Sequence, residues 1–428
     1  MNKSDSERIA GYLENLGYKL NNDRYSSDLV VINTCGVRQS AEDRIYGIIP
    51  SIKKKNSKAK IILTGCLSQR KDVQKRLRDK VDIWLPIVNL PKLNKLLRVT
   101  RYALRETDYL KLRPKHSSVF SAFVPIGNGC NNFCSYCVVP MARGREIYRP
   151  VQDILNEVSK LAKNGYKEIN LIAQNVNSYK YNANAANDMR MPRIANNANK
   201  YFNFVDLLKI INNNIEGDFW IRFSTSHPKD MSDELIKTII DCDKVCRHIH
   251  LPVQAGDNKI LKAMNRNYTV GHYKKLIKKI RRAMPDASIT TDAIVGFPRE
   301  TREQFNNTAE LFKEMKFDMA YISKYSPRPG TAAENLDDNV SRPEKKKREK
   351  KLMEILRKTA WGDNKKYIGE IVEVLIEGEK NNFYFGKTKT GKSVRIMNYE
   401  LGIRNLVGKF MKVKIIKVRD FGLEGELA

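Results

Sequence analysis

Long apolar runs are missing from this chain of 428 residues. No stretch approaches the roughly 18 consecutive apolar residues that a membrane-spanning helix needs, so the sequence predicts no membrane segment. The opening residues, MNKSDSERIA, are polar and lack the apolar core of a secretory leader. There are seven cysteines, an odd number. We therefore expect a cytoplasmic protein whose thiols stay reduced and serve clusters or metals rather than disulfides.

Acidic residues are few beside the basic ones, 48 against 78, which gives a formal net charge of +30. Such an excess concerns partners rather than fold, and it suits a polyanion, with nucleic acid as the first choice. A generally lysine-rich proteome is the alternative, because lysine and asparagine are abundant throughout the chain. The length is enough for two or three domains with cores of their own.

A fourth cysteine is missing from an otherwise compact cysteine motif. The stretch GCNNFCSYC places Cys130, Cys134 and Cys137 at the spacing CxxxCxxC, and the next residues, VVP, contain no further thiol. Three thiolates on such a loop can hold three corners of a [4Fe-4S] cluster and leave one iron open to a substrate or cofactor. The alternatives are half of a zinc site or three unrelated thiols. Zinc sites usually pair two CxxC arms, which favours the cluster.

Two buried strands of the N-terminal region each end near a cysteine. Residues 28–34 (DLVVINT) lead to Cys35, and residues 60–64 (KIILT) lead to Cys66, with helices predicted around them. This alternation predicts a parallel sheet of Rossmann-like or flavodoxin-like winding, in which ligands lie beyond the carboxyl ends of the strands. We expect the two cysteines to converge on one ligand. The alternative is that they are merely small buried residues at strand ends.

The same region opens on a helix, whereas a doubly wound domain normally starts with a strand. Ser4 and Glu7 predict a capping box for this helix, and Gly17 ends it. If the pattern of the next two strand–helix units held, the missing first strand would also end in a cysteine.

The cysteine loop resembles the signature of the radical S-adenosylmethionine (SAM) superfamily, in which the open iron binds SAM and the reduced cluster cleaves it. Combined with the N-terminal domain, residues 1–100, it resembles the methylthiotransferases, which implies a second [4Fe-4S] cluster held by three cysteines. Cys35 in NTCGVRQSAE and Cys66 in TGCLSQR match the second and third of these. The family's first cysteine stands in a segment like GCQMNxxDSE, and this sequence starts at MNKSDSE. Either a start codon placed too late or a truncated copy accounts for the difference, and we favour the late start.

Residues 117–360 alternate strands and helices in about six units, which predicts an open, partial TIM-like barrel, as the radical SAM resemblance also implies. Polar residues at the ends of the strands are our candidates for binding SAM. These candidates are Gln174, Asn175, Ser226, Gln254 and Gly296. The amides and the hydroxyl can bond the ribose, the adenine or the methionine moiety, and the glycine lets backbone approach closely. Ordinary loop capping is the alternative.

Residues 366–428 contain short strands separated by turn residues, which predicts a small antiparallel barrel of OB-like kind. The phrases FGKTKTGKSVRI and GKFMKVKIIKV resemble a TRAM domain, an RNA-binding module. Basic residues here and near the cysteine loop are our candidates for contacting RNA, and Phe383, Tyr384 and Phe385 offer stacking surfaces. These are Lys387, Lys389 and Arg395 in the barrel, Arg143 and Arg145 in MARGRE, and Arg328 in YSPRPGT. For the MARGRE arginines, binding of a phosphate or carboxylate stands beside simple solvation.

Three other features have a structural interpretation. Cys242 and Cys246 are predicted to pack in the core rather than bind metal, and His248 also favours packing. Residues 181–200 predict an inserted surface loop. Residues 342–358 predict a very basic helix, for which a solvated connector and an RNA-facing surface are equally favoured.

The resemblance covers nearly the whole chain. FVPIGNGCNNFCSYCVVP, AQNVNSYK and HLPVQAG look most like the methylthiotransferases that modify C2 of N6-isopentenyladenosine at position 37 of tRNA. Related enzymes act on threonylcarbamoylated adenosine or on an aspartate of a ribosomal protein. The implied partners are the anticodon stem-loop of tRNA and a reductant such as a flavodoxin or ferredoxin, and we expect a monomer. Two alternatives of another class are a copy that cleaves SAM without inserting sulfur, and an RNA-binding protein with a structural metal.

Overall fold

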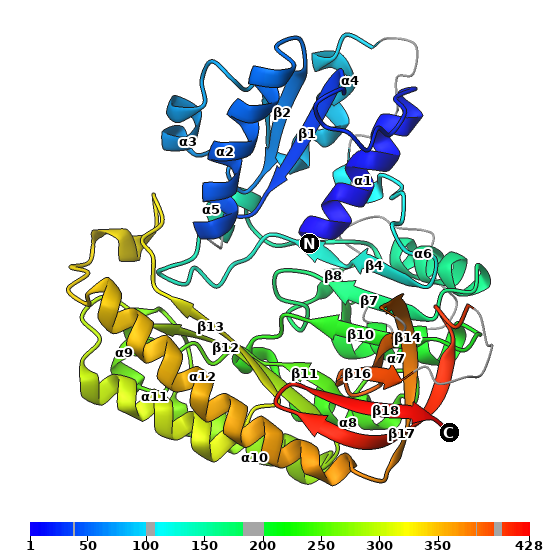
Figure 1. The fold of residues 1–428 in the computed structure, drawn as a ribbon, viewed down its shortest axis with the longest axis vertical. Helices are drawn as coiled ribbons and strands as arrows, with labels where there is room; N and C mark the ends of the chain where they lie inside the picture. Colours follow the sequence, from blue (N-terminus) through cyan, green and yellow to red (C-terminus); the bar gives the residue numbers. More distant parts are fainter. Residues whose placement is uncertain (37–38, 100–107, 183–200, 382, 398–404) are drawn as a thin grey trace. The chain divides into compact units, whose positions relative to one another are not determined.

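A computed structural model describes residues 1–36, 39–99, 108–182, 201–381, 383–397 and 405–428 (Figure 1). Contacts between residues divide the chain into two compact units. The first consists of Met1–Ser117, Gly127–Arg149 and Ser326–Asn335, and the second of Ser118–Ile126, Pro150–Tyr325 and Leu336–Ala428. All five cysteines that we expect to hold clusters therefore belong to the first unit. Most of the surface loop predicted at residues 181–200 lies outside the described residues.

The first unit is built on a three-stranded parallel sheet, which confirms the predicted sheet of the N-terminal region. Its strands, in spatial order, are β1 (Leu29–Thr34), β2 (Lys60–Gly65) and β3 (Ile83–Leu85). The central strand is buried from its second residue onward, as expected for a strand with both faces covered.

Helices cover both faces of this sheet. Successive side chains of a strand point in opposite directions, so neighbouring residues of β2 contribute to different cores. Ile62 of β2 belongs to a core cluster with residues of α1 (Asn2–Asn15). Its neighbour Ile61 belongs to a second cluster, with residues of α2 (Gln39–Lys55) and α3 (Lys71–Arg76). The helices α1 and α2 accordingly lie on opposite sides of β1 and β2 (Figure 1).

The start of α1 differs from the prediction. Its N-cap is Met1, and no side chain caps the helix. The Ser4 hydroxyl, which we predicted as the cap, is buried within the first turn and accepts a hydrogen bond from the Arg8 guanidinium at 2.7 Å. The predicted capping box is therefore wrong, because a partner one turn away occupies the hydroxyl.

Short elements complete the first unit around the cysteine loop. β5 (Gly127–Asn128) pairs antiparallel with β6 (Ile147–Tyr148), and the segment between them carries the three loop cysteines and α5 (Val139–Arg143). The other short helices are η1 (Ile87–Lys92), α4 (Leu93–Leu96), η2 (Tyr109–Lys111) and η4 (Ala332–Asn335).

Six parallel strands form the open barrel of the second unit, as predicted. They pair in two groups, β10-β7-β4 and β11-β12-β13, and a bridge between Ile221 and Val245 joins β10 to the segment that leads into β11. Among the described strands, β4 and β13 stand at the two ends of this order. The strands are β4 (Ser121–Pro125), β7 (Glu168–Ile172), β10 (Trp220–Ser224), β11 (His248–His250), β12 (Ser288–Val295) and β13 (Met319–Lys324).

Helices alternate with these strands along the chain (Figure 1). None of the described helices combines the length and the apolar character that crossing a membrane requires. The helices are α6 (Val151–Lys163), α7 (Phe204–Asn214), η3 (Pro228–Asp230), α8 (Asp233–Asp241), α9 (Asn258–Ala263), α10 (Val270–Ala283), α11 (Arg302–Met315), α12 (Arg342–Asn364) and η5 (Lys365–Tyr367). A small hairpin of β8 (Lys180–Asn182) and β9 (Tyr201–Asn203) precedes α7.

The C-terminal segment folds into the predicted small barrel, closed in the order β14-β15-β16-β18-β17. All its pairs are antiparallel except that between β16 and β18. Alternate side chains point inward and form one apolar core. The strands are β14 (Ile371–Lys380), β15 (Phe383–Thr388), β16 (Ser393–Met397), β17 (Phe410–Arg419) and β18 (Gly422–Leu427).

This small barrel packs against the N-terminal ends of the open barrel's strands. Trp220, the first residue of β10, lies with its ring 4.6 Å from the ring of Phe410 and packs with Cys246 and Leu375. Cys246 is thus a packing residue, as predicted. His248 is also packed here, since a Cβ on Gly391 would lie 3.0 Å from its ring.

Polar contacts reinforce the same junction. The buried Arg222 forms an ion pair with Glu168 and donates hydrogen bonds to the backbone oxygens of Thr388 at 2.7 Å and Lys389 at 3.1 Å. Lys392 bridges to Asp318 at 2.5 Å. The turn between β15 and β16 therefore closes the end of the open barrel that is opposite to the expected cofactor side.

Candidate functional site

The loop with the three cysteines is closed at its neck by backbone contacts. The Cys130 amide donates to the Gly144 carbonyl at 3.2 Å, and the Cys137 amide donates to the Cys134 carbonyl at 3.0 Å. Gly129 has φ +86°, and a Cβ there would lie 2.1 Å from the Arg145 oxygen. Only glycine fits at this position, so the loop geometry depends on it.

The thiols of this loop are partly buried. Burial raises the pKa of Cys137 to about 12 and also raises the pKa of Cys130. A thiol in such surroundings becomes a thiolate when a metal centre supplies the compensating charge. Within the described ranges, no three His, Cys, Asp or Glu side chains are placed so that they could hold a single metal ion. A cubane presents a separate iron to each thiolate, so three half-buried thiols on one loop fit it.

The second pair of cysteines comes together as predicted. Cys35 follows β1 and Cys66 follows β2, where Thr34 and Gly65 are paired in register. The Cys66 amide donates to the Thr34 carbonyl at 3.1 Å. Both thiols therefore lie at the carboxyl edge of the sheet, although their binding of a cluster remains a prediction.

The two sets of cysteines are neighbours within the first unit. A Cβ added to Gly36 would lie 3.0 Å from the Cβ of Cys66 and 3.1 Å from a methyl group of Val138. Val138 directly follows Cys137, and Gly36 directly follows Cys35. Gly36, beside one set, thus lies against Val138, beside the other set, which their separation in sequence does not suggest.

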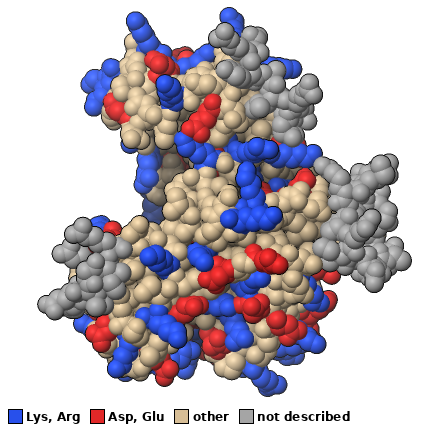
Figure 2. Space-filling model, turned by 90° about the vertical axis from the view of Figure 1, so that its right-hand side faces the viewer, with Lys and Arg blue, Asp and Glu red and all other residues tan. Residues whose placement is uncertain are grey.

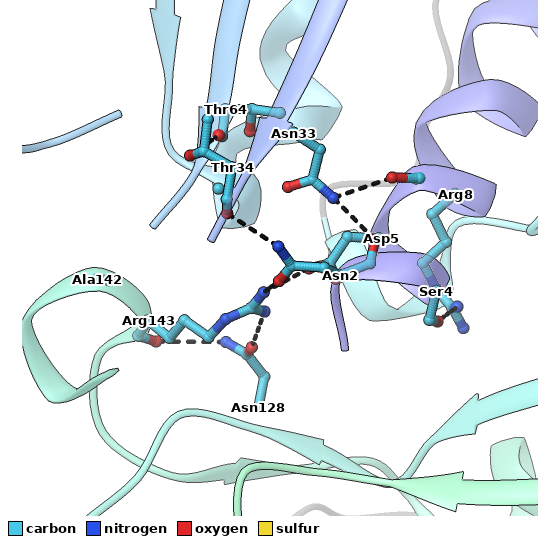
Figure 3. Close-up of polar contacts among 12 residues, drawn as sticks. Asn2, Ser4, Asp5, Arg8, Asn33, Thr34, Thr64, Asn128, Ala142 and Arg143 are labelled. Carbon is cyan, nitrogen blue, oxygen red and sulfur yellow. Dashed lines mark hydrogen bonds and ion pairs between the residues drawn. The ribbon is translucent and has the colours of Figure 1, made fainter. Parts of the chain in front are cut away.

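Arg143 lies inside the first unit rather than on a surface that RNA can reach (Figure 3). Its guanidinium contacts the Asp5 carboxylate at 2.5 Å, the Asn128 side-chain oxygen at 3.0 Å and the Asn2 side-chain oxygen at 3.2 Å. The Tyr109 hydroxyl donates to the same carboxylate at 2.6 Å. Of the two partners foreseen for Arg143, the structure shows the carboxylate, and the predicted RNA contact finds no support.

The other two arginines outside the small barrel differ from each other. Arg145 is exposed, so its contact with RNA stays a prediction. Arg328 is buried, donates to the Gln39 side chain at 2.7 Å and lies 3.5 Å from the Glu42 carboxylate. The same carboxylate binds Arg70 through two hydrogen bonds of 2.6 and 2.9 Å. Arg328 thus ties the SPRPGT loop to α2, and its burial does not support the predicted RNA contact.

Three of the candidates for binding SAM carry buried polar atoms with no hydrogen-bond partner. These atoms are Oε1 of Gln174, Oδ1 of Asn175 and Oγ of Ser226, which follow β7 and β10 in the second unit. Buried polar atoms are nearly always paired in a complete structure, so these atoms leave room for a polar partner such as a water molecule or a ligand, and their binding of SAM stays a prediction. The donor and acceptor chemistry of a nucleoside and an amino acid fits this set.

The backbone amides of the remaining two SAM candidates already have partners within the protein. The Gln254 amide donates to the Asp292 carbonyl at 2.8 Å, and its φ of +70° bends the backbone after β11. The Gly296 amide donates to the Glu300 carboxylate at 2.7 Å, and a Cβ on Gly296 would meet the side chain of Lys345 at 2.3 Å. Glycine suits this position because of its φ of +67° and the packing of Lys345, and the approach of the cofactor to this backbone stays a prediction.

The small barrel offers a groove of about 770 Å³ whose lining contains aromatic and basic side chains together with the acidic Glu377 and Asp420. Its lining includes Trp361, Phe385, Phe421, Arg395, Lys417 and Arg419. Exposed aromatic rings beside cations are what stacking on unpaired bases needs. Figure 2 shows lysine and arginine side chains spread over the visible face, with acidic side chains among them.

The predicted RNA-binding residues of the small barrel divide between this groove and protein contacts. Arg395 lines the groove, with its guanidinium 3.4 Å from the centre of the Phe383 ring. Lys387 pairs with Glu377 at 2.8 Å, and Lys389 donates to the backbone oxygen of Asp243. Of the aromatic members of the groove, Phe385 is one of the rings that the sequence offers for stacking. Trp361 of α12 and Phe421 between β17 and β18 were missed, because they lie outside the strand that carries Phe385.

Comparisons with known proteins agree with this domain order. Residues 124–312 match the model of the Radical SAM superfamily, residues 1–86 that of the uncharacterized protein family UPF0004, and residues 365–428 that of the TRAM domain. The solved structure of the radical S-adenosylmethionine methyltransferase TsrM from Kitasatospora setae covers 78% of this chain and 73% of its own, with 14% identity and a TM-score of 0.49. The cysteine loop and the family models together define a radical SAM protein, a class that uses a [4Fe-4S] cluster and SAM.

Curated relatives extend the match to the full chain. The tRNA-2-methylthio-N(6)-dimethylallyladenosine synthase of Clostridium tetani is 41% identical over 444 residues, which cover 100% of this chain and 94% of the relative. The enzyme of the same name from Thermoanaerobacter pseudethanolicus is 42% identical over 448 residues, 100% and 90% of the two chains. The chain belongs to the family of tRNA-2-methylthio-N(6)-dimethylallyladenosine synthases.

Proposed function

We propose that this protein is a radical SAM methylthiotransferase that adds a methylthio group to C2 of N6-isopentenyladenosine at position 37 of tRNA. The observation that carries the proposal is the meeting of two cysteine sets, Cys35 with Cys66 and the loop of Cys130, within one compact unit. A reaction that makes a carbon–sulfur bond at an unactivated carbon needs a radical source and a sulfur source side by side. The names of the relatives support the same assignment.

Each group has residues suited to hold it. In the first unit, Cys130, Cys134 and Cys137 would bind the first cluster, whose open iron takes SAM. In the second unit, the unpaired atoms after β7 and β10 are the candidates for hydrogen bonds to SAM. Cluster and SAM supply radical chemistry at a C–H bond that acid–base groups cannot activate. Accordingly, no catalytic residue beyond the cluster ligands is required.

Cys35 and Cys66 would hold the second cluster, which carries the sulfur. These two residues match the second and third of the family's three cysteines, and the iron content per chain tests whether this cluster forms. Loss of this cluster would leave a protein that cleaves SAM without inserting sulfur.

The tRNA would bind through its anticodon stem-loop, with unpaired bases stacking in the aromatic groove of the small barrel and the target adenine turned out of its stack. The net charge of +30 supports a polyanionic substrate. A flavodoxin or ferredoxin would supply electrons to a monomeric enzyme in the cytoplasm.

The decisive experiment measures iron and acid-labile sulfide per chain after anaerobic reconstitution, beside a variant with the three loop cysteines changed to alanine. About eight irons, falling to about four in the variant, are expected for two cubane clusters. The reduced protein is then incubated with SAM and tRNA that carries isopentenyladenosine, and the nucleosides are analysed by mass spectrometry. Methylthio product supports the proposal. Cleavage of SAM with about four irons and no product, or product only with threonylcarbamoylated tRNA or a ribosomal protein, contradicts it.

A further inference from the structure

The Arg143 side chain holds the two ends of the cysteine loop together and also contacts residues outside the loop. Asn128 stands just before the loop, and Arg143 stands at the end of the helix that follows it. The Asn128 amide donates to the Arg143 carbonyl at 3.3 Å, while the Arg143 guanidinium donates to the Asn128 side-chain oxygen at 3.0 Å. These two reciprocal hydrogen bonds hold the two ends of the loop together.

The same guanidinium binds the first helix of the chain. It pairs with Asp5 at 2.5 Å and donates to Asn2 at 3.2 Å, while Tyr109 bonds the other carboxylate oxygen of Asp5 (Figure 3). Asp5 is fully buried, and Arg143 is 6% exposed. A buried ion pair with additional hydrogen bonds on both partners has one favourable geometry, because any displacement leaves a charge unpaired.

A further series of hydrogen bonds continues from Asn2 to the second cysteine pair. The Asn2 side chain donates to the Thr34 carbonyl at 3.0 Å, immediately before Cys35. The Thr34 hydroxyl donates to the Thr64 carbonyl at 2.6 Å and accepts from the Leu67 amide at 3.0 Å, immediately after Cys66. Figure 3 shows these contacts converging at the ends of β1, β2 and α1.

We propose that Arg143 is a positioning residue that fixes the cysteine loop relative to Cys35 and Cys66, so that the sulfur source stands where the substrate radical forms. This inference rests on the proposed function, and it names the residue that aligns the two sets of cysteines. A displacement on the order of 1 Å between reacting groups can cost about a hundredfold in rate. The alternative role, simple stabilisation of the loop, predicts a different pattern of losses.

The test compares full-length Arg143→Gln and Arg143→Lys with the wild type. We measure iron per chain, 5′-deoxyadenosine formed from SAM, and methylthio product per 5′-deoxyadenosine. Asp82→Asn is the control, because Asp82, like Asp5, pairs with a cation, here Lys53, and it accepts the Ile61 amide at the opposite end of β2. Asn2→Ala is a milder second variant that removes the same link, and it decides the test if Arg143→Gln does not fold.

For Arg143→Gln and Asn2→Ala we expect SAM cleavage within about threefold of wild type, and product per 5′-deoxyadenosine reduced about tenfold or more. Arg143→Lys, which keeps the charge, should recover part of the ratio, and Asp82→Asn should leave it unchanged. An unchanged ratio in the Arg143 and Asn2 variants, or loss of iron, cleavage and product together, overturns the proposal.

A second readout does not require the loaded enzyme. In the protein without clusters, exchange of the Leu67 amide hydrogen should accelerate about tenfold or more in Arg143→Gln, and not in Asp82→Asn, because the link to Thr34 is lost. Equal exchange in both overturns the proposal. If the wild type cleaves SAM but makes no methylthio product, the proposed function fails, and this exchange measurement still decides whether Arg143 links the two cysteine sets.

Discussion

Replacing Arg222 with methionine should loosen the small barrel from the open barrel. The substitution keeps an apolar stem but removes the partner of Glu168, whose pKa is held below its usual range by Arg222 against the opposing effect of burial. It also leaves the backbone oxygens of Thr388 and Lys389 without their donor. Removing one member of a buried pair typically costs about 3–5 kcal/mol, and we expect a loss of about 4 kcal/mol.

The assay is urea unfolding followed by the fluorescence of Trp220, which lies against Phe410 at this junction. Trp84→Phe and Trp361→Phe in the background leave it as the sole tryptophan. The double variant Arg222→Met/Glu168→Leu should lose clearly less than the sum of the two single losses, because no charge remains buried alone. A loss below about 1 kcal/mol in Arg222→Met, or single losses that simply add, would refute the argument.

Three further predictions concern single side chains. Ser226→Ala should leave the unfolding free energy of the SAM-free protein within about 0.5 kcal/mol of wild type, since the hydroxyl has no partner there, and should weaken SAM binding about tenfold in calorimetry; equal affinity contradicts the assigned site. Burial lowers the pKa of His248 to about 3, so the unfolded chain takes up a proton below its own pKa of about 6.5 and the fold does not. Stability should therefore fall as pH decreases from about 6.5 toward 3, by at most about 1.4 kcal/mol per pH unit, and His248→Gln should flatten the dependence of the urea midpoint on pH; an unchanged slope counts against it. Phe385→Ala should weaken tRNA binding by about 1–3 kcal/mol in gel shifts without changing SAM cleavage, whereas Tyr201→Ala, an exposed ring on β9, should not; equal effects of the two variants would exclude the groove.

Local patterns were enough for most of the fold. The apolar runs before Cys35 and Cys66 predict buried parallel strands, and parallel strands bring their carboxyl ends to one edge. The strand–helix alternation likewise predicts the open barrel, and the turn residues after residue 366 predict the small one. These inferences succeed because each depends on residues that are neighbours in the chain.

Other features depend on residues that are far apart in sequence. Nothing local indicates that Arg143 binds Asp5, 138 positions earlier, and an arginine in a basic stretch favours solvent or phosphate on composition alone. Ser4 failed as a cap because Arg8 takes its hydroxyl. Gly296 serves the packing of Lys345, which arrives from a later helix. In each case the partner that decides the role comes from another element of the fold.

The junction at Trp220 has a consequence for synthesis on the ribosome. The apolar surfaces of Trp220 and Cys246 are covered by Leu375 and Phe410, which emerge well over a hundred residues later. Until then, the nascent open barrel exposes this apolar surface, which can associate with other chains or bind a chaperone. The strands translated last thus cover an apolar surface of the domain that precedes them. A stop codon before residue 366 would therefore yield an aggregation-prone fragment rather than a smaller enzyme.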